Sequence, residues 1–144
     1  WQPGRPPTQD LPFLCGDITP RALRVPEGDV RQHGNGATGV QSLSVAVLHL
    51  AQSVQRYQAL LGPDAQIRAA TAEHSATITL GPTLLLLEQA RPNADAARGT
   101  AAQQLGSRGE GVFSLTLKRA DSDLEPATNA LSHGAVIHPK SATV

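Results

Sequence analysis

The residue best placed to do chemistry is Glu88, which directly follows the four consecutive leucines Leu84–Leu87. A run without a polar position is typical of a strand that is covered on both faces. A carboxylate at the end of such a strand is desolvated unless it is paired, and it could then accept a proton or coordinate a cation. The alternative is an ordinary exposed glutamate where the strand meets solvent. We therefore take Glu88 as the candidate catalytic residue and a candidate metal ligand.

A second group of candidates lies in and before a glycine-rich run that begins at His33 and contains Asn35 and Gly36. Glycines let the backbone approach a ligand closely, and an imidazole or an amide could bind that ligand. The alternative is turn chemistry, in which Asn35 and Gly36 supply a backbone with positive φ. Arg24 could hold an anionic group or form a surface ion pair. The sequence thus predicts His33, Asn35 and Arg24 as ligand-binding residues, with His33 also a metal ligand.

The other reactive side chains and the composition exclude several classes of function. No metal-ligand spacing relates the remaining histidines, which are His49, His74, His133 and His138. The single cysteine, Cys15, cannot form an internal disulfide, which fits a reducing, cytoplasmic compartment. The 12 basic and 12 acidic residues balance and aromatic residues make up 3%, so a nucleic-acid platform is not expected. The longest apolar run, Leu84–Leu87, is far short of the roughly 20 residues that span a bilayer.

The elements that must position these residues repeat along the chain at an offset of 72 residues (111 − 39). Residues 39–45, Gly-Val-Gln-Ser-Leu-Ser-Val, align without gaps with residues 111–117, Gly-Val-Phe-Ser-Leu-Thr-Leu. The alignment continues to Gly62 and its counterpart Gly134. Each copy has the pattern of a strand, a helix closed by glycine and a second strand, which predicts a fold built from paired α+β modules.

Local patterns give the expected boundaries. Alternating residues predict a strand over 42–47, and helical spacing predicts a helix from Leu50 to the stop signal at Gly62 and Pro63. Further strands are expected at 65–70, 75–80 and 83–88. We divide the chain into a Pro/Gly-rich N-terminal segment (1–38) with one short strand at about 11–15, a first βαβββ module (39–90), a mobile loop (91–110) and a partial second module (111–144), whose second strand covers 136–138. Because the chain opens on tryptophan and stops just after that strand, we expect it to be the C-terminal part of a longer protein.

This organisation resembles the glyoxalase-like branch of the vicinal oxygen chelate superfamily. The superfamily also includes bleomycin resistance proteins and extradiol dioxygenases. The resemblance is carried by residues 11–15, Arg24-Val-Pro, the run 33–39, the strand–helix stretch that ends at Gly62, and residues 131–134 of the second copy. It implies an α+β fold in which paired βαβββ modules form a curved mixed sheet, with a small organic molecule held in the resulting cup. It also implies a divalent metal held by His, Gln or Glu at the start of a module's first strand and at the end of its fourth.

These implied ligand positions carry over to this chain only in part. Glu88 stands at the end of the fourth strand, where a ligand is expected. At the start of the first strand the aligned residue is Ser42, and in the second copy it is Ser114. Serine is a weak ligand for a hard divalent cation. The missing ligands would come from an N-terminal module outside this sequence, or no metal would bind.

Three functions remain open on the sequence alone. The resemblance favours a domain that binds a small organic molecule and performs metal-assisted isomerase, lyase or oxygenase chemistry, with one divalent metal ion as cofactor. The two serines favour a non-catalytic module that sequesters its ligand. The abrupt ends of the chain favour a structural half that pairs with an N-terminal module of the same protein or forms a homodimer. A small-molecule partner is expected in the first two cases, and neither nucleic acid nor a membrane in any.

Overall fold

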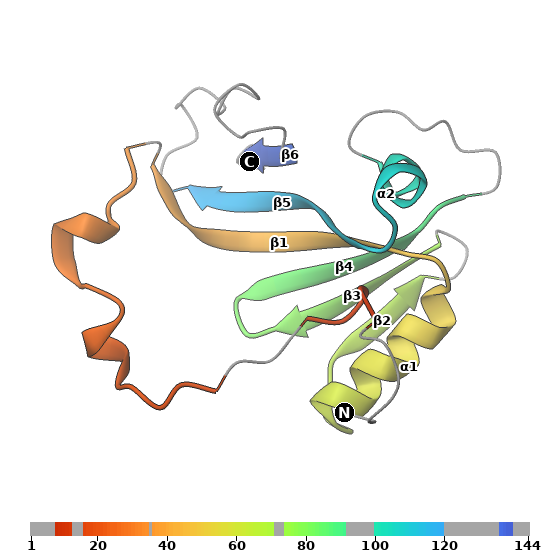
Figure 1. The fold of residues 1–144 in the computed structure, drawn as a ribbon, viewed down its shortest axis with the longest axis horizontal. Helices are drawn as coiled ribbons and strands as arrows, with labels where there is room; N and C mark the ends of the chain where they lie inside the picture. Colours follow the sequence, from red (N-terminus) through yellow and green to blue (C-terminus); the bar gives the residue numbers. More distant parts are fainter. Residues whose placement is uncertain are drawn as a thin grey trace.

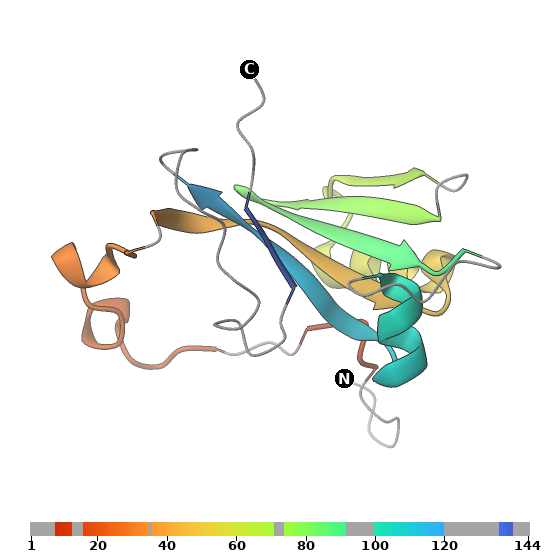
Figure 2. The same cartoon turned by 90° about the horizontal axis from the view of Figure 1, so that it is seen from above.

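The computed structural model describes residues 8–12, 16–34, 36–70, 74–91, 100–119 and 136–139. Figure 1 shows their arrangement as one mixed sheet with two helices. The elements follow in the order η1 (Arg21–Leu23), η2 (Gly28–Arg31), β1 (Ala37–Val47), α1 (Leu50–Leu61), β2 (Ile67–Ala70), β3 (Ser75–Leu80), β4 (Thr83–Gln89), α2 (Ala101–Ser107), β5 (Gly111–Arg119) and β6 (Val136–Pro139). The two 3₁₀ helices, η1 and η2, bury no residue and belong to an arm that reaches away from the sheet (Figures 1 and 2).

The six strands lie in the order β2-β3-β4-β1-β5-β6. Within the first half, β1 runs parallel to β4, and β3 is antiparallel to both β2 and β4. The elements β1-α1-β2-β3-β4 therefore form one complete βαβββ module, as predicted. The second half joins it through the antiparallel pair β1–β5, and β6 runs parallel to β5. The predicted α+β fold, with paired modules of which the second is incomplete, is confirmed.

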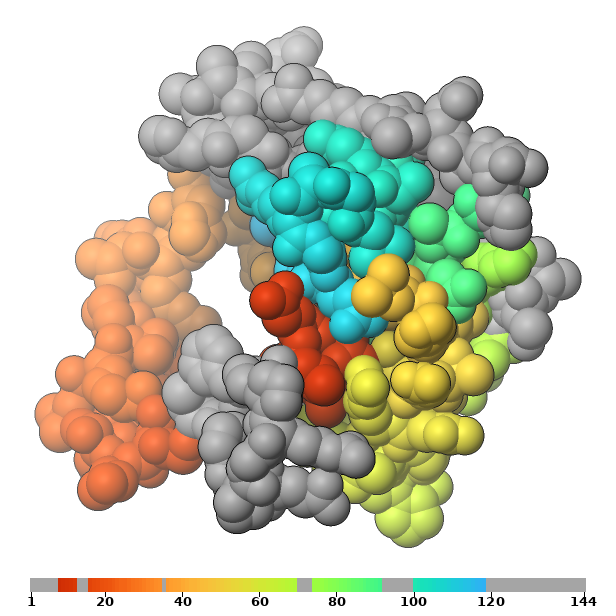
Figure 3. Space-filling model, turned by 45° about the vertical axis from the view of Figure 1, so that its right-hand side comes forward, coloured from red at the N-terminus to blue at the C-terminus, as the bar shows by residue number. Residues whose placement is uncertain are grey.

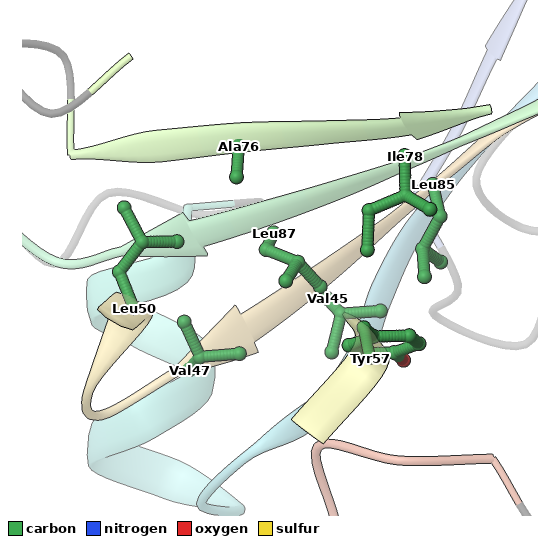
Figure 4. Close-up of a cluster of buried hydrophobic side chains, with 8 residues drawn as sticks. All are labelled: Val45, Val47, Leu50, Tyr57, Ala76, Ile78, Leu85 and Leu87. Atoms are coloured by element: carbon green, nitrogen blue, oxygen red, sulfur yellow. The ribbon is translucent and has the colours of Figure 1, made fainter. Parts of the chain in front are cut away.

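The hydrophobic core lies between α1 and one face of the sheet. The buried side chains of this cluster are Val45, Val47, Leu50, Tyr57, Ala76, Ile78, Leu85 and Leu87 (Figure 4). The helix begins at Leu50 and stops at Gly62, whose φ of 88° places it in the left-handed region that favours glycine. Because side chains alternate along a strand, the opposite face of the sheet receives Ser42 and Ser44 from β1 and Leu86 and Glu88 from β4.

The N-terminal residues 8–12 close one side of this core. Figure 3 shows this segment, in red, between α1 and the start of β5. Asp10 is only 1% exposed, and its carboxylate accepts hydrogen bonds from Ser53 Oγ (2.6 Å) and Arg56 Nη1 (2.8 Å). Tyr57 Oη donates to the Asp10 carbonyl oxygen at 2.7 Å. Three α1 side chains thus hold one residue of the preceding segment.

These contacts change the ionisation of both buried acids. Burial raises the pKa of the Asp10 carboxyl, but hydrogen bonds from Ser53, Arg56 and Thr8 and the positive charge of Arg56 outweigh it, so that the pKa lies below its ordinary value. Burial, and then the negative charge of Asp10, raise the pKa of Tyr57 to about 12.

Two expectations drawn from the sequence require correction. The loop expected over 91–110 contains the helix α2, capped by Thr100, whose side chain accepts a hydrogen bond from Gln103 N (3.2 Å). The shortage of large apolar residues was misleading there, because small alanines favour helix and Ala101 is buried at 7% exposure. In the strand expected at 11–15, Leu11 and Pro12 are not in a strand, and residues 13–15 lie outside the described residues. No helix in the described part of the chain is long and apolar enough to cross a membrane.

Candidate functional site

A pocket of about 550 Å³ opens on the face of the sheet opposite α1, between the start of β3, the end of β4 and the start of α2. We call it the strand-end pocket. Its lining includes residues that carry hydroxyl, imidazole, carboxylate and guanidinium groups, which are His74, Ser75, Thr77, Glu88, Arg91 and Thr100. Leu86 and Ala101 supply part of the apolar lining. The mixture of apolar wall and a few convergent polar groups is typical of a small-molecule site.

Glu88 reaches this pocket because of its register in the sheet. It lies opposite Ala46 on β1 and Ser75 on β3, two small residues that leave space beside its carboxylate. Its side chain is half-buried, and among the described residues no hydrogen bond or ion pair engages it. The expectation that the leucines of β4 are covered on both sides holds for one face. Leu85 is buried in the core, whereas Leu86 is half-buried on the pocket side.

His74 enters the pocket from the connection between β2 and β3. Its backbone φ is 55°, in the left-handed region. Within the described ranges, His74 is the single residue other than glycine with a positive φ. That conformation costs about 1–2 kcal/mol for a residue with a Cβ, although histidine adopts it more readily than most. Its carbonyl oxygen accepts a hydrogen bond from Gln89 N at 2.9 Å. This hydrogen bond therefore holds the strained backbone of His74 against the end of β4, next to Glu88.

Arg91 lies three positions after Glu88, just beyond the end of β4. Its side chain is exposed and contributes to the pocket wall. No hydrogen bond or ion pair within the described part of the chain engages its guanidinium. The three groups Glu88, His74 and Arg91 thus meet at one end of the sheet, where a base, a hydrogen-bond donor and a fixed positive charge are available to a ligand.

The structure does not bring His33 to this pocket. His33 lines a separate pocket of about 500 Å³, beside Glu27 and Arg31 on the exposed arm. It precedes Ala37 at the start of β1, whereas Glu88 pairs with Ala46 near the other end of that strand. Nine residues at about 3.3 Å each place the two ends roughly 30 Å apart. Glu88 and His33 therefore cannot hold the same metal ion in this fold.

The metal-ligating side chains that the structure describes do not make a metal centre. Within the described ranges, no group of three or more His, Cys, Asp or Glu residues could hold a metal ion. The aligned serines, Ser42 and Ser114, are buried at 9% and 7% exposure on the central strands. Their neutral hydroxyls suit hydrogen bonding better than coordination of a divalent cation. The residues that the structure describes do not fit the metal that the resemblance implies.

Arg24, which the sequence also predicts to bind the ligand, is not among the residues that line the strand-end pocket. Arg24 forms an ion pair with Asp17 (2.6 Å) and donates to the Thr19 carbonyl oxygen (3.3 Å), all on the exposed arm. This is the surface ion pair that was the alternative interpretation. Asn35 lies outside the described residues.

Sequence reasoning missed His74 and Arg91. For His74 no signal was available, since its role depends on a turn geometry that spacing does not reveal. Arg91 offered one: a charged residue three positions after Glu88 must stay near the same strand end. Both residues reach the pocket through the hairpin of β3 and β4, in which Ser75 pairs with Glu88.

Comparison with known proteins finds similarity to solved structures in the fold of the backbone. No family model matches the sequence, and no curated protein sequence matches it significantly. Methylmalonyl-CoA epimerase from Mycobacterium tuberculosis aligns over 63% of this chain and 61% of its own, at 20% identity and a TM-score of 0.47. A variant of Streptomyces coelicolor methylmalonyl-CoA epimerase in complex with 2-nitronate-propionyl-CoA aligns over 60% of this chain and 66% of its own, at 21% identity and a TM-score of 0.46. This chain spans less than two thirds of either structure.

Proposed function

We propose that this chain binds a small organic molecule in the strand-end pocket and that Glu88 accepts a proton from it. The observation that carries the proposal is the position of the Glu88 carboxylate, half-buried in the wall of a pocket of about 550 Å³ and without a partner among the described residues. A carboxylate in such a site can serve as a general base when a ligand brings an acidic C–H within reach. Proton removal and return at carbon is the chemistry of an isomerase.

The hydroxyl and imidazole groups of the wall support the same chemistry. Removing a proton beside a carbonyl group leaves negative charge on the carbonyl oxygen, and hydrogen-bond donors aimed at that oxygen stabilise it. Ser75, Thr77 and His74 can supply such donors from the pocket wall. No metal enters this scheme, because the described donors do not form a metal centre.

A second candidate function is sequestration of the ligand without turnover. It is favoured by the serines at the two positions where the resemblance implies metal ligands, Ser42 and Ser114. In that case the pocket binds the molecule, and Glu88 contributes a hydrogen-bond acceptor only. The two candidates make the same prediction for binding and opposite predictions for proton transfer.

The test is a screen of small organic molecules, neutral and charged, by ligand-observed NMR. Binders are mapped on the backbone amides of Ser75, Thr77 and Glu88, and are then incubated with the protein in D₂O. Exchange of a carbon-bound proton for deuterium that is lost in Glu88→Gln supports the general base, whereas binding without exchange supports sequestration. The matched control is Glu27→Gln, on the exposed arm. Absence of any binder at the strand-end pocket would overturn the proposal.

A further inference from the structure

We infer that the ligand of the strand-end pocket is a small carboxylate whose charged group is bound by Arg91. The inference rests on the proposed function, since it concerns the same pocket. Its basis is that Arg91 lines the pocket and that no carboxylate of the described residues forms an ion pair with it.

What distinguishes Arg91 from the other arginines is its place in the strand-end pocket. Arg24, Arg31 and Arg56 each pair with a carboxylate, from Asp17, Glu27 and Asp10 respectively. Among the described arginines that form no such ion pair, Arg91 is the one that lines this pocket. Arg91 has Glu88 only three residues away at the same strand end, and yet no ion pair joins them. Both groups contribute to the pocket wall instead. A carboxylate bound to Arg91 would give it the kind of ion pair that Arg24, Arg31 and Arg56 form within the chain.

The charge of the site selects the class of anion. Its described wall contains one permanent positive charge, on Arg91, and one carboxylate, on Glu88. A single guanidinium matches the charge of a monocarboxylate and binds it through two parallel N–H···O bonds. A phosphate ester with two negative charges would need a second cation to offset the nearby Glu88. The site therefore favours a monocarboxylate over a phosphate.

His74 lines the same pocket and would contact a different part of the ligand from Arg91. Its backbone is fixed by the hydrogen bond from Gln89 N to its carbonyl oxygen, two residues before Arg91. The left-handed conformation of a non-glycine residue at a pocket wall is the kind of strain that accumulates at ligand sites. Together with the hydroxyls of Ser75 and Thr77, the imidazole offers donors to a second oxygen of the ligand.

The experiment measures binding of matched acid and amide pairs by ligand-observed NMR titration: butyrate and butyramide, benzoate and benzamide, pyruvate and pyruvamide. Each amide keeps the shape of its acid and removes the charge. We expect at least one acid to bind about tenfold more tightly than its amide, because a charge-assisted pair is lost in the amide. Arg91→Gln should reduce this ratio to about twofold or less, and Arg91→Lys should retain part of it.

The control is Arg31→Gln, which removes the same charge from the exposed arm, where Arg31 pairs with Glu27. It should leave the preference for the acid unchanged, which separates a local contact from an effect of net charge. Equal binding of acids and amides, or a preference that survives Arg91→Gln, would overturn the inference while leaving the proposed function intact. If neither these pairs nor the neutral compounds of the wider screen bind, the proposed function fails and the inference with it.

Discussion

Leu43 on β1 and Leu115 on β5 lie directly opposite each other across the antiparallel pair that joins the two halves of the sheet. They are also equivalent positions of the 72-residue repeat (115 − 43). On either side of them, Ser42 faces Thr116 and Ser44 faces Ser114, again the pairing that a local twofold axis requires. Beyond this pair, β6 runs parallel to β5 as β4 runs parallel to β1. For β1 and β5 the repeat in the sequence is thus a local rotation in the structure, centred on these two leucines. β6 has the place beside β5 that β4 has beside β1, although its residues 136–139 correspond to residues 64–67 by the same offset.

The two leucines should nevertheless differ in their contribution to stability. Leu43 packs against the core cluster under α1, whereas Leu115 is half-buried outside that cluster. Because a truncated side chain costs more where more contacts are lost, we expect Leu43→Ala to lower the free energy of unfolding by about 2 kcal/mol and Leu115→Ala by about 1 kcal/mol. Urea denaturation of the two variants measures this difference. Equal losses would show that the symmetry of the backbone extends to the packing.

Tyr57 predicts a fall in stability at alkaline pH. Its folded pKa of about 12 lies above the ordinary value of 10, so the contribution is fully present below pH 10 and is lost as the pH rises from 10 through 12. The shift corresponds to about 2–3 kcal/mol. Tyr57→Phe should remove this dependence and cost about 1–2 kcal/mol at pH 7, because the Asp10 carbonyl oxygen loses its donor.

The measurement is the free energy of unfolding of both proteins at several values between pH 9 and pH 12. Comparison with Tyr57→Phe separates Tyr57 from every other group that titrates in this range, because those groups are present in both proteins. Parallel curves for the two proteins would contradict the assignment.

Asp10 predicts the opposite dependence, at acid pH. Its folded pKa lies below the ordinary 3.8, so its contribution is present above pH 3.8 and is lost as the pH falls through the folded value. Asp10→Asn should lower the free energy of unfolding by about 1–2 kcal/mol at pH 7, since the pair with Arg56 loses its charge. At a pH below the folded pKa the variant and the parent should converge in stability. Thermal unfolding from pH 7 into the acid range tests this, and a gap that does not narrow as the pH falls below 3.8 would contradict the assignment.

Particular residues show what the sequence could and could not predict. The helix Leu50–Leu61 and the strand Ser75–Leu80 were predicted at their observed bounds, because spacing and Gly62 record local geometry directly. Glu88 was placed correctly at a strand end for the same reason. The meeting of Glu88 with His74 and Arg91 depends on the pairing of β3 with β4, which is a property of the folded sheet. The separation of His33 from Glu88 depends on the length of β1, which begins at Ala37, six residues before the predicted strand's first leucine, Leu43.

The contacts of Asp10 illustrate the same limit. One face of α1 carries Ser53, Arg56 and Tyr57, which are spaced three and four residues apart or less. Two polar residues therefore lie beside a buried tyrosine. The spacing does not indicate that the partner of these residues is more than 40 positions earlier, because the segment that supplies it has no periodic pattern of its own.

His74 allows backbone strain and ligand binding to be separated. Glycine adopts a φ of 55° without steric cost, so His74→Gly should leave the free energy of unfolding unchanged or raise it by about 1 kcal/mol, the gain being offset by the greater freedom of the unfolded chain. His74→Ala keeps the strain and should be about 1 kcal/mol less stable than the glycine variant. Both variants preserve the carbonyl that accepts from Gln89 N, and both lack the imidazole.

Urea denaturation compares their stabilities, and NMR titration with the acid that binds most tightly compares their affinities. We expect the two variants to bind this acid several-fold more weakly than the parent and equally to each other, because a single hydrogen-bond donor is lost in both. Unchanged affinity in both would remove His74 from the site, and a glycine variant less stable than the alanine variant would show that the left-handed backbone carries no strain.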